Sequence, residues 1–444
     1  MSAKWGWAIY DIYRAASRAI APFVYLHIHL RRLRGLEHRS RWLERFGRPT
    51  TPRPPGPLIW FHAVSLGEGL AAIPVIKHCL QEYPNVLVLM TTTTVSAFEV
   101  IKDKLPNSVI YQFAPIDTPM AMENFLVYWS PVAVILMESE LWPNLIISAS
   151  RKGIAVALLN ARMSYKSFKR WSLRISLPLI ALMLSKFSLI VALSTTEAVR
   201  YQLLNAPPFI INFAGDLKYA VGGLQLSQRE NKSIERLKLQ LKDRPVWMAA
   251  SIHSGETEVM ISVHNELARV FPNLVTILVT RHPRHGQQLV EALQKRGMHA
   301  ALRSRCEMVS PCVNVYVVDT LGELGMLYRV SPIAVIGGSF QSGLSGHNFS
   351  EAAAAGCAVL TGPHLGHFSR MLAEMKQVDY QSVLQVEGKL ELVKALKQLL
   401  SSTELLESHQ RSAKLAFSAV SNGVVQNVWN LVDAQCLQSR QAFG

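Results

Sequence analysis

Acidic residues follow apolar runs of the chain at points where a strand is expected to pass into a helix. The stretch "WFHAVSLGEG" (60–69) ends an apolar run in a glycine-flanked turn that carries Glu68. In open α/β sheets, ligands bind in the crevice outside the carboxyl ends of the strands. An acid there is either a negative charge that the positive end of a helix dipole stabilises, or a catalytic proton acceptor. Position alone favours the helix charge.

A pair of acidic residues and two basic residues follow later apolar runs. In "MESELWPN" (137–144), Glu138 and Glu140 are two residues apart, so a continued strand would point both to one face. A buried carboxylate pair needs a cation or a shared proton, and a helix N-terminal cluster is an equally supported alternative. Arg162 in "NARMS" and Lys218 in "AGDLKY" are either surface cations or ligands for a phosphate or carboxylate.

The second half of the chain carries motifs suited to a phosphate. "GGSFQSGLSGHNFSEAAAAG" (337–356) is a glycine-rich loop that leads through His347 and Asn348 to Glu351, at the start of an alanine-rich helix. Such a loop allows close approach of backbone N–H groups to a phosphate, and the carboxylate suits ribose hydroxyls; purely structural turns are the alternative. "TRHPRH" (280–285) and "VDTLGEL" (318–324) also follow strand-like runs, and the second opens another helix.

Several classes of protein are disfavoured by motifs that the sequence lacks. No Gly-Lys-Ser/Thr follows the glycine-rich loop, and no GxGxxG follows a strand, which argues against a Walker A nucleotidase and a nicotinamide dehydrogenase. No GxSxG elbow and no metal-ligand spacing of His, Cys and Asp is present, so no metal is expected. The five cysteines form no CxxC pair, which favours buried free thiols in a reducing compartment.

Positive charge is concentrated near the N-terminus. The net charge is +15, and residues 1–53 hold eleven Lys/Arg against three acidic residues, more than half of that excess. A local basic arm with interspersed Trp and Tyr predicts a membrane-surface helix or an organellar targeting segment, and not nucleic-acid binding. No stretch is a convincing transmembrane helix.

The strand and helix pattern predicts two Rossmann-like α/β domains facing a cleft, plus the basic N-terminal helix. The expected parts are a helical arm at 1–47, one Rossmann-like domain at 48–220 and another at 221–444, with a charged linker near 225–244. The runs expected to form strands are 58–64, 86–92, 132–137, 155–159, 189–193, 246–250, 274–279, 313–318, 333–336 and 358–360.

Eight motifs in the same order resemble the 3-deoxy-D-manno-octulosonic acid (Kdo) transferase family. The likeness runs from about Trp60 to Phe368, and the motifs are "WFHAVSLGEG", "MESELWPN", "NARMS", "GDLKY", "TRHPRH", "DTLGEL", "GGS" and "GHNFSEAAAAG". The resemblance implies a two-domain GT-B glycosyltransferase fold. It also implies inverting transfer of Kdo from CMP-Kdo to a lipid A precursor (the tetraacyldisaccharide 1,4'-bisphosphate, lipid IVA), with no metal or other cofactor.

The resemblance also assigns roles to individual residues. Glu68 would be the catalytic base, and Glu138 and Lys218 would stabilise the transition state. The CMP pocket would be lined by Thr280, Arg281, Leu321, Gly322, Glu323, Asn348, Phe349, Ser350 and Glu351. Two alternatives stay open: a non-catalytic nucleotide-binding module, and a transferase for another nucleotide sugar.

Departures from the family pattern bear on localisation. The family's usual "GGHNPLE" is "SGHNFSE" here, and its "PRHP" is "TRHP". The first variant and the "RRLRGLEHRSRW" arm resemble the plant, mitochondrial branch of the family. A peripheral membrane protein of mitochondria is therefore expected, and the cytoplasmic face of a bacterial inner membrane is the alternative.

Basic residues that recur every three or four positions suggest an acceptor surface. On one helix they would form a stripe beside the apolar run 175–184. We expect the stripe to contact the phosphates of a lipid acceptor, with the apolar run and the N-terminal arm against its acyl chains; a solvated helix face is the alternative. The residues are Arg162, Lys166, Lys169, Arg170 and Arg174.

Overall fold

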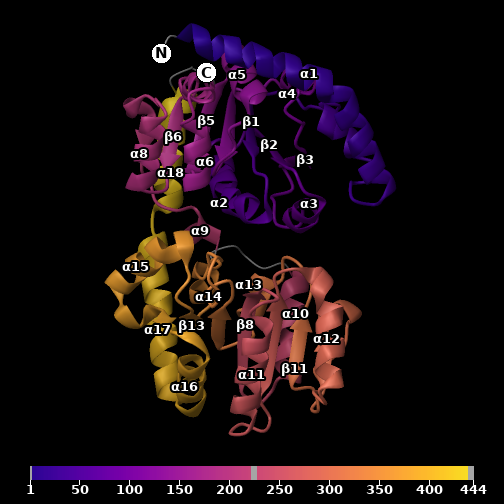
Figure 1. The fold of residues 1–444 in the computed structure, drawn as a ribbon, viewed down its shortest axis with the longest axis vertical. Helices are drawn as coiled ribbons and strands as arrows, with labels where there is room; N and C mark the ends of the chain where they lie inside the picture. The colour runs from indigo at the N-terminus through magenta and orange to yellow at the C-terminus, as the bar shows by residue number, and fades with distance from the viewer. Residues whose placement is uncertain (1–2, 222–227, 439–444) are drawn as a thin grey trace. The chain divides into compact units, whose positions relative to one another are not determined.

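Two compact α/β units make up the protein (Figure 1). The computed structural model describes residues 3–221 and 228–438. The first unit comprises the chain up to Ala220 and again from Gly423, and the second comprises Val221–Asn422. Part of the predicted linker, residues 225–227, lies outside the described residues. Most of the remaining predicted linker is helical, because it contains α10 (Gln228–Gln240), which belongs to the second unit.

The first unit is built on a parallel sheet in the order β3-β2-β1-β4-β5-β6-β7. Its central strands are buried along their whole length, as expected for apolar strands with helices on both faces. The order reverses direction between β1 and β4. The strands are β1 (Leu58–His62), β2 (Leu87–Thr92), β3 (Ile110–Phe113), β4 (Ala133–Met137), β5 (Ala155–Ala161), β6 (Leu189–Ala192) and β7 (Ile211–Asn212).

The second unit repeats this plan with the order β10-β11-β9-β8-β12-β13-β14. All of its strand pairs are parallel, and the direction reverses between β8 and β12. The strands are β8 (Val246–Ile252), β9 (Val275–Thr280), β10 (Ala300–Leu302), β11 (Val315–Val318), β12 (Ile333–Ile336), β13 (Ala358–Thr361) and β14 (Leu384–Gln385).

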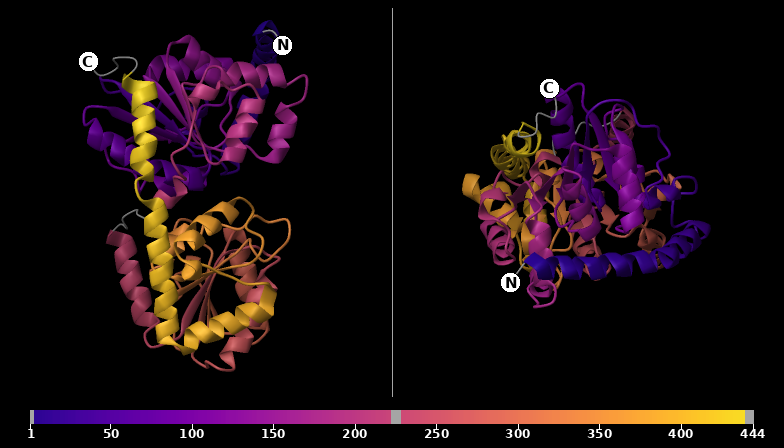
Figure 2. Two further views of the ribbon diagram at one scale, coloured as in Figure 1. Left: turned by 90° about the vertical axis from the view of Figure 1, so that its left-hand side faces the viewer. Right: turned by 90° about the horizontal axis from the view of Figure 1, so that it is seen from above.

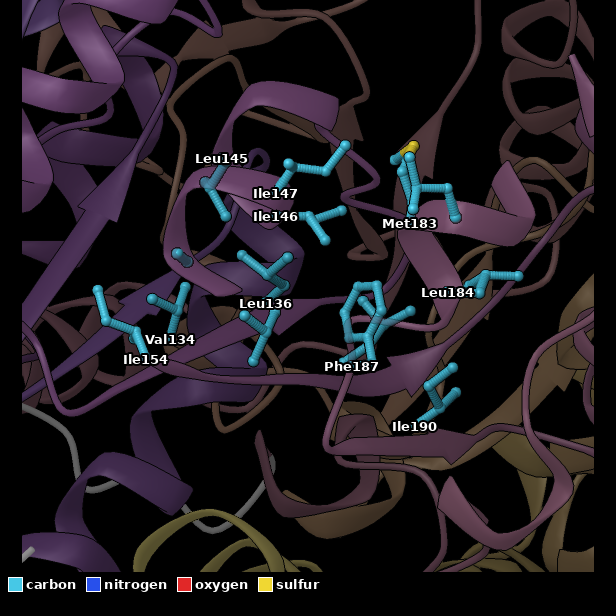
Figure 3. Close-up of a cluster of buried hydrophobic side chains, with 14 of the residues drawn as sticks. Val134, Leu136, Leu145, Ile146, Ile147, Ile154, Met183, Leu184, Phe187 and Ile190 are labelled. Atoms are coloured by element: carbon cyan, nitrogen blue, oxygen red, sulfur yellow. The ribbon is translucent and has the colours of Figure 1, made fainter. Parts of the chain in front are cut away.

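Helices cover both sheets and supply the rest of each core. In the first unit, Figure 3 shows Leu136 of β4 near Ile146 of α5, within a cluster that includes Met183 of α7. Further core residues of the second unit come from α11, α12 and α16. Helices of the first unit include α2 (Leu66–Glu82), α3 (Val95–Ile101), α4 (Pro119–Trp129), α5 (Pro143–Arg151), α6 (Tyr165–Trp171), α7 (Leu177–Leu184) and α8 (Thr195–Leu203). Helices of the second unit include α11 (Thr257–Ala268), α12 (Gly286–Lys295), α13 (Leu324–Leu327), α14 (Ser350–Ala354), α15 (Ser369–Val378) and α16 (Gly388–Ser401).

The N-terminal helix α1 (Ala3–Leu33) packs along one side of the first unit (Figure 2). Gly6 permits close contact with α7, because a Cβ at Gly6 would lie 2.7 Å from the Pro178 carbonyl oxygen. Tyr10 is buried, and the Tyr13 hydroxyl donates to the Asp117 carboxylate at 3.0 Å. The predicted arm at 1–47 is therefore packed against this unit. Its helix ends at Leu33, and a short 3₁₀ helix, Trp42–Phe46, follows. Among the described residues, no helix is long and apolar enough to cross a membrane.

The C-terminal segment returns to the first unit, which corrects the predicted domain at 221–444. After α17 (Thr403–Ser421), Gly423 begins the segment that contains α18 (Val424–Val432). This helix packs on α2 (Figure 2). The Tyr83 hydroxyl donates to Asp433, directly after the helix, at 2.6 Å. Sequence patterns did not reveal this return because it depends on contacts between segments about 350 residues apart.

Candidate functional site

The predicted site residues of the first unit lie at the carboxyl edge of its sheet, beside the point where strand order reverses. Glu68 follows β1 and Glu138 follows β4, the two strands that flank that point. In open α/β sheets this is where ligands bind. Lys218 follows β7 and reaches Glu138, so the structure brings together the three residues predicted to be catalytic.

Glu68 caps its own helix, as position alone suggested. The Ser65 side chain accepts from the Glu68 N–H, and the two Glu68 oxygens accept from the Ser65 hydroxyl at 2.9 Å and the Val64 N–H at 2.8 Å. This is a variant of the capping box. Burial raises the pKa of Glu68, the bonds from Val64 and Ser65 oppose that shift, and the charge of Glu138 adds to it. Each carboxylate oxygen still has a lone pair for a further proton donor, so capping and base chemistry are compatible.

Glu138 and Lys218 form a largely buried ion pair. The Lys218 Nζ lies 2.6 Å from Glu138 Oε1, and each side chain is 13% exposed. Glu138 has a φ of 56°, a left-handed conformation that is unusual outside glycine. Such a strained conformation persists only where the surrounding structure maintains it, and strained residues are concentrated at functional sites. Here it directs a carboxylate toward Lys218 at the end of β4.

Asn160 and Asp216 hold the loop that carries Lys218, and sequence patterns alone did not identify them. Asn160 Nδ2 donates to Asp216 Oδ1 at 2.7 Å, and Asn160 Oδ1 accepts from the Leu217 N–H at 2.9 Å. The Lys218 N–H donates to the same Asp216 oxygen at 2.8 Å. The motifs "NARMS" and "GDLKY" are thus joined through these two residues.

Glu140 belongs to the same edge and is buried. Burial, followed by the nearby charge of Glu68, raises the pKa of Glu140 to about 8. Its Oε2 lies 4.0 Å from His62 Nε2. Burial lowers the pKa of His62 to about 3, and Thr91 Oγ1 pairs with its Nδ1 at 2.9 Å. Both partners are therefore neutral at pH 7, and Glu140 is a protonated carboxyl beside two ionisable ones.

The predicted basic stripe is only partly helical. Helix α6 is capped by Ser164 and ends at Trp171, so Arg162 precedes the helix and Arg174 follows it. Lys166, Lys169 and Arg170 are exposed on α6.

The apolar run at 175–184 was expected to contact acyl chains, and for its buried residues this expectation is wrong. Leu179, Ile180, Leu182, Met183 and Leu184 are buried in the core of the first unit. Ile175, which is 82% exposed, remains available on the surface.

The predicted nucleotide residues of the second unit lie at the carboxyl edge of its own sheet. Thr280 ends β9, and its hydroxyl donates to the Val318 carbonyl at 3.4 Å. Arg281 is exposed, and its backbone N–H donates to the Ile252 carbonyl at the end of β8. A cationic side chain here suits a phosphate.

Glu323, in the turn after β11, is held by a cation that sequence analysis missed. Arg303 donates to its two oxygens at 2.7 and 3.1 Å. Burial would raise the pKa of Glu323, but the bonds from Arg303 and Thr320 outweigh it and lower that pKa. Gly322 has a φ of 82°, which glycine adopts readily, and Leu321 is 41% exposed. Within this turn, Leu321 is therefore the exposed residue.

The loop that ends in α14 is ordered by its own side chains. Asn348 Oδ1 accepts from the Ser350 N–H at 3.0 Å and its hydroxyl at 2.8 Å, and Asn348 Nδ2 donates to Glu351 at 3.2 Å. The side chains of Phe349 and Ser350 are fully buried. Of the predicted residues Asn348 to Glu351, these two are therefore buried in the core and are not exposed to a ligand. Among the described residues, no group of three or more His, Cys, Asp or Glu could hold a metal ion.

Solved structures of known proteins share this fold. A glycosyltransferase from Rickettsia africae matches with a TM-score of 0.56 at 12% identity, covering 87% of this chain and 100% of that one. A putative UDP-N-acetylglucosamine 2-epimerase from Listeria monocytogenes matches with a TM-score of 0.57 at 10% identity, covering 85% and 96%. With two parallel seven-stranded sheets, each with a reversal of strand order, the chain has the GT-B glycosyltransferase type of fold.

Sequence comparison identifies the family within that class. A family model described as 3-deoxy-D-manno-octulosonic-acid transferase matches residues 40–221. The probable 3-deoxy-D-manno-octulosonic acid transferase, mitochondrial, of Arabidopsis thaliana is 56% identical over 98% of both chains. The 3-deoxy-D-manno-octulosonic acid transferase of Haemophilus influenzae is 33% identical over 93% of this chain and 95% of its own. The chain belongs to the Kdo transferase family.

Proposed function

We propose that the protein transfers Kdo from CMP-Kdo to the lipid A precursor lipid IVA, with inversion at the anomeric carbon. What supports the proposal most directly is the group of Glu68, Glu138 and Lys218 at the strand-order reversal of the first sheet, in a chain of the Kdo transferase family. The second unit would bind the donor nucleotide, and the first unit would supply the base.

In this reaction Glu68 accepts the proton of the acceptor hydroxyl. The hydroxyl oxygen forms a bond to the anomeric carbon of Kdo while the bond from that carbon to the phosphate oxygen breaks, and CMP departs with the electron pair. The raised pKa of Glu68 suits it to this task, because a carboxylate of ordinary pKa is a weak base near neutrality. Attack opposite the leaving group inverts the anomeric centre.

Fixed positive groups would offset the negative charge of the transition state and of CMP. Lys218 is held in place by Glu138 and by the backbone bonds to Asp216, so it needs little rearrangement. Arg281 and the backbone N–H groups after β11 and β12 would bind the phosphate. The proposal includes no metal or other cofactor, and transfer should persist in the presence of EDTA.

The proposal extends to a membrane surface through α1. Trp5, Ile12, Phe23 and Leu33 on this helix are each more than 60% exposed. Basic residues Lys4, Arg14, Arg18 and Arg34 are exposed on or directly after it. Apolar and basic side chains together suit binding at the interface of an anionic membrane, where lipid IVA would be reached. Because the Arabidopsis relative is described as mitochondrial, we propose a peripheral location on a mitochondrial membrane.

The Glu68→Gln variant tests the enzyme against the alternative of a non-catalytic nucleotide-binding module. Gln at this helix position still forms the capping box, so the fold should persist while the base is lost. We expect wild-type protein to add Kdo to lipid IVA, seen by mass spectrometry, and the variant to be about 100-fold slower or worse with CMP binding unchanged. No transfer by the wild type would contradict the proposed function, and wild-type rates in the variant would contradict the role of Glu68.

A further inference from the structure

Two histidines meet where the strand order of the second sheet reverses. His253 follows β8 and His347 lies in the loop after β12, the two strands that flank that point. Their Nε2 atoms are 3.0 Å apart, and the rings are parallel within 4° with centroids 5.2 Å apart. At that distance one Nε2 must carry a proton and donate it to the lone pair of the other. The two Nε2 atoms therefore share a single proton.

Two basic side chains and one carboxylate face the pair. Arg281 and His282 come from the segment after β9, and the His282 ring centroid lies 5.9 Å from that of His253. Glu256 is the carboxylate that acts on His253, and its oxygens accept three backbone N–H bonds, at 2.7 to 3.1 Å. Those donors are the N–H groups of His253, Gly338 and Phe340. The carboxylate is thus occupied in joining this loop to the start of α11.

The loop is shaped to accommodate His347. Gly338 has a φ of 69°, and a Cβ there would lie 3.0 Å from His347 Nε2. A side chain at this position would therefore crowd the histidine as well as strain the backbone. The glycine-rich loop that sequence analysis associated with a phosphate thus fits closely around an imidazole.

The uncharged pair occupies a place that suits an anion. Burial, followed by the charge of Arg281, lowers the pKa of His347 to about 4. Burial also lowers the pKa of His253, and Glu256 only partly offsets this effect. At pH 7 both imidazoles are neutral. A negative charge beside them would favour the protonated form and raise these pKa values.

We propose that the His253–His347 pair binds the phosphate of the nucleotide donor and takes up one proton from solvent as it does so. The proton adds to Nδ1 of the imidazole that donates through Nε2–H, so that this ring becomes an imidazolium and its partner stays neutral. No covalent bond changes. The proposal rests on the proposed function, because it takes the ligand to be a nucleotide phosphodiester such as CMP-Kdo.

Calorimetry on the full-length protein tests this proton uptake. Cytidine 5'-methyl phosphate is the probe, because a phosphodiester keeps one charge from pH 6.5 to 8.5, whereas the second pKa of CMP, about 6, would confuse the measurement. Binding enthalpies in buffers of different ionisation enthalpy give the number of protons taken up. We expect a value approaching one per ligand, with affinity falling up to about tenfold for each pH unit above neutrality. Cytidine, which lacks the phosphate, should take up none.

His347→Gln retains a hydrogen-bonding side chain that cannot be protonated. Because the imidazole that remains in a single variant can still take up a proton, we expect the double variant His253→Gln/His347→Gln to bind the probe about tenfold more weakly at pH 6.5, to take up no proton and to lose the pH dependence. His299→Gln is the matched control, because His299 precedes β10 at the opposite edge of the sheet. Circular dichroism checks that each variant is folded.

Three results would overturn the inference: no proton uptake by the wild type, an unchanged pH dependence in the double variant, or no binding of the probe. Transfer of Kdo by the wild type, measured separately, decides whether the proposed function fails with it. Transfer without proton-linked binding would leave the proposed function in place and remove this role of the pair.

Discussion

At the scale of single residues, the site depends on backbone conformations that no sequence motif specifies. Glu138, Asn160 and Ser251 have φ between 52° and 59° at the ends of β4, β5 and β8. The strand pairings of β5 and β8 also shift register near these positions. By contrast, the Ser65-x-x-Glu68 spacing does contain the capping interaction. Residue types and their places after strands were predictable, whereas the strain that aims them requires the surrounding sheet.

Replacement of Glu140 by Gln should change the pH dependence of stability. The folded-state pKa of Glu140 is about 8, above its ordinary value of 4.5, so its effect on stability is most favourable below 4.5 and is lost as the pH rises toward 8. Gln resembles the protonated carboxyl and removes this loss. We expect the unfolding free energy of the variant, relative to wild type, to increase between pH 5 and pH 8, as measured by urea denaturation.

The matched control for Glu140 is Glu123→Gln, at an exposed position in the same unit whose ion pair is with Lys152, a side chain that stays charged from pH 5 to pH 8. Its difference from wild type should stay small at both pH values. A Glu140→Gln difference that is the same at pH 5 and pH 8 would mean that Glu140 is already ionised at pH 5.

At the scale of elements, the interior of each sheet was predictable and its margins were not. All ten predicted strand runs are strands of the structure. The four strands that were missed, β3, β7, β10 and β14, are the outer strands of the two sheets and have two to four residues each. Such runs are too short for a periodic signal. Spacing likewise suggested one basic stripe over 162–174, but α6 is only seven residues long.

Removal of the exposed charges of α6 should weaken acceptor binding without slowing chemistry. In the double variant Lys166→Gln/Arg170→Gln, two cations that we propose to contact lipid phosphates are lost. Exposed charge pairs each contribute about 0.2 to 1 kcal/mol, so the KM for lipid IVA should rise by about 2- to 30-fold with kcat unchanged. Lys394→Gln/Lys397→Gln removes two exposed charges from α16 and should leave KM as it is. Equal KM values in both double variants would exclude α6 from the acceptor surface.

At the scale of the whole molecule, the chain passes from the first unit to the second and back again. Local patterns identify the inner strands of each sheet but cannot tell which sheet a final helix covers. Helix α18 has a strongly apolar face, which buries Val424, Val428 and Val432. At Gly215, near the end of the first unit's long segment, a Cβ would lie 2.9 Å from Val424, so the returning segment packs closely there. The first unit is therefore completed by residues that follow the second.

Truncation of Trp429 should destabilise the first unit and spare the second. The side chain is 2% exposed and contacts the rings of His78 and Tyr83 of the first unit at 6.1 and 6.2 Å between centroids. Trp429→Ala should therefore cost about 3 to 5 kcal/mol of unfolding free energy. Hydrogen exchange read by mass spectrometry assigns that loss to peptides of each unit separately. Trp5→Ala, at a residue 64% exposed, removes the same atoms from the surface and should cost little. Lost protection in peptides of 228–422, with residues 58–220 unaffected, would place α18 energetically with the second unit despite its contacts with α2.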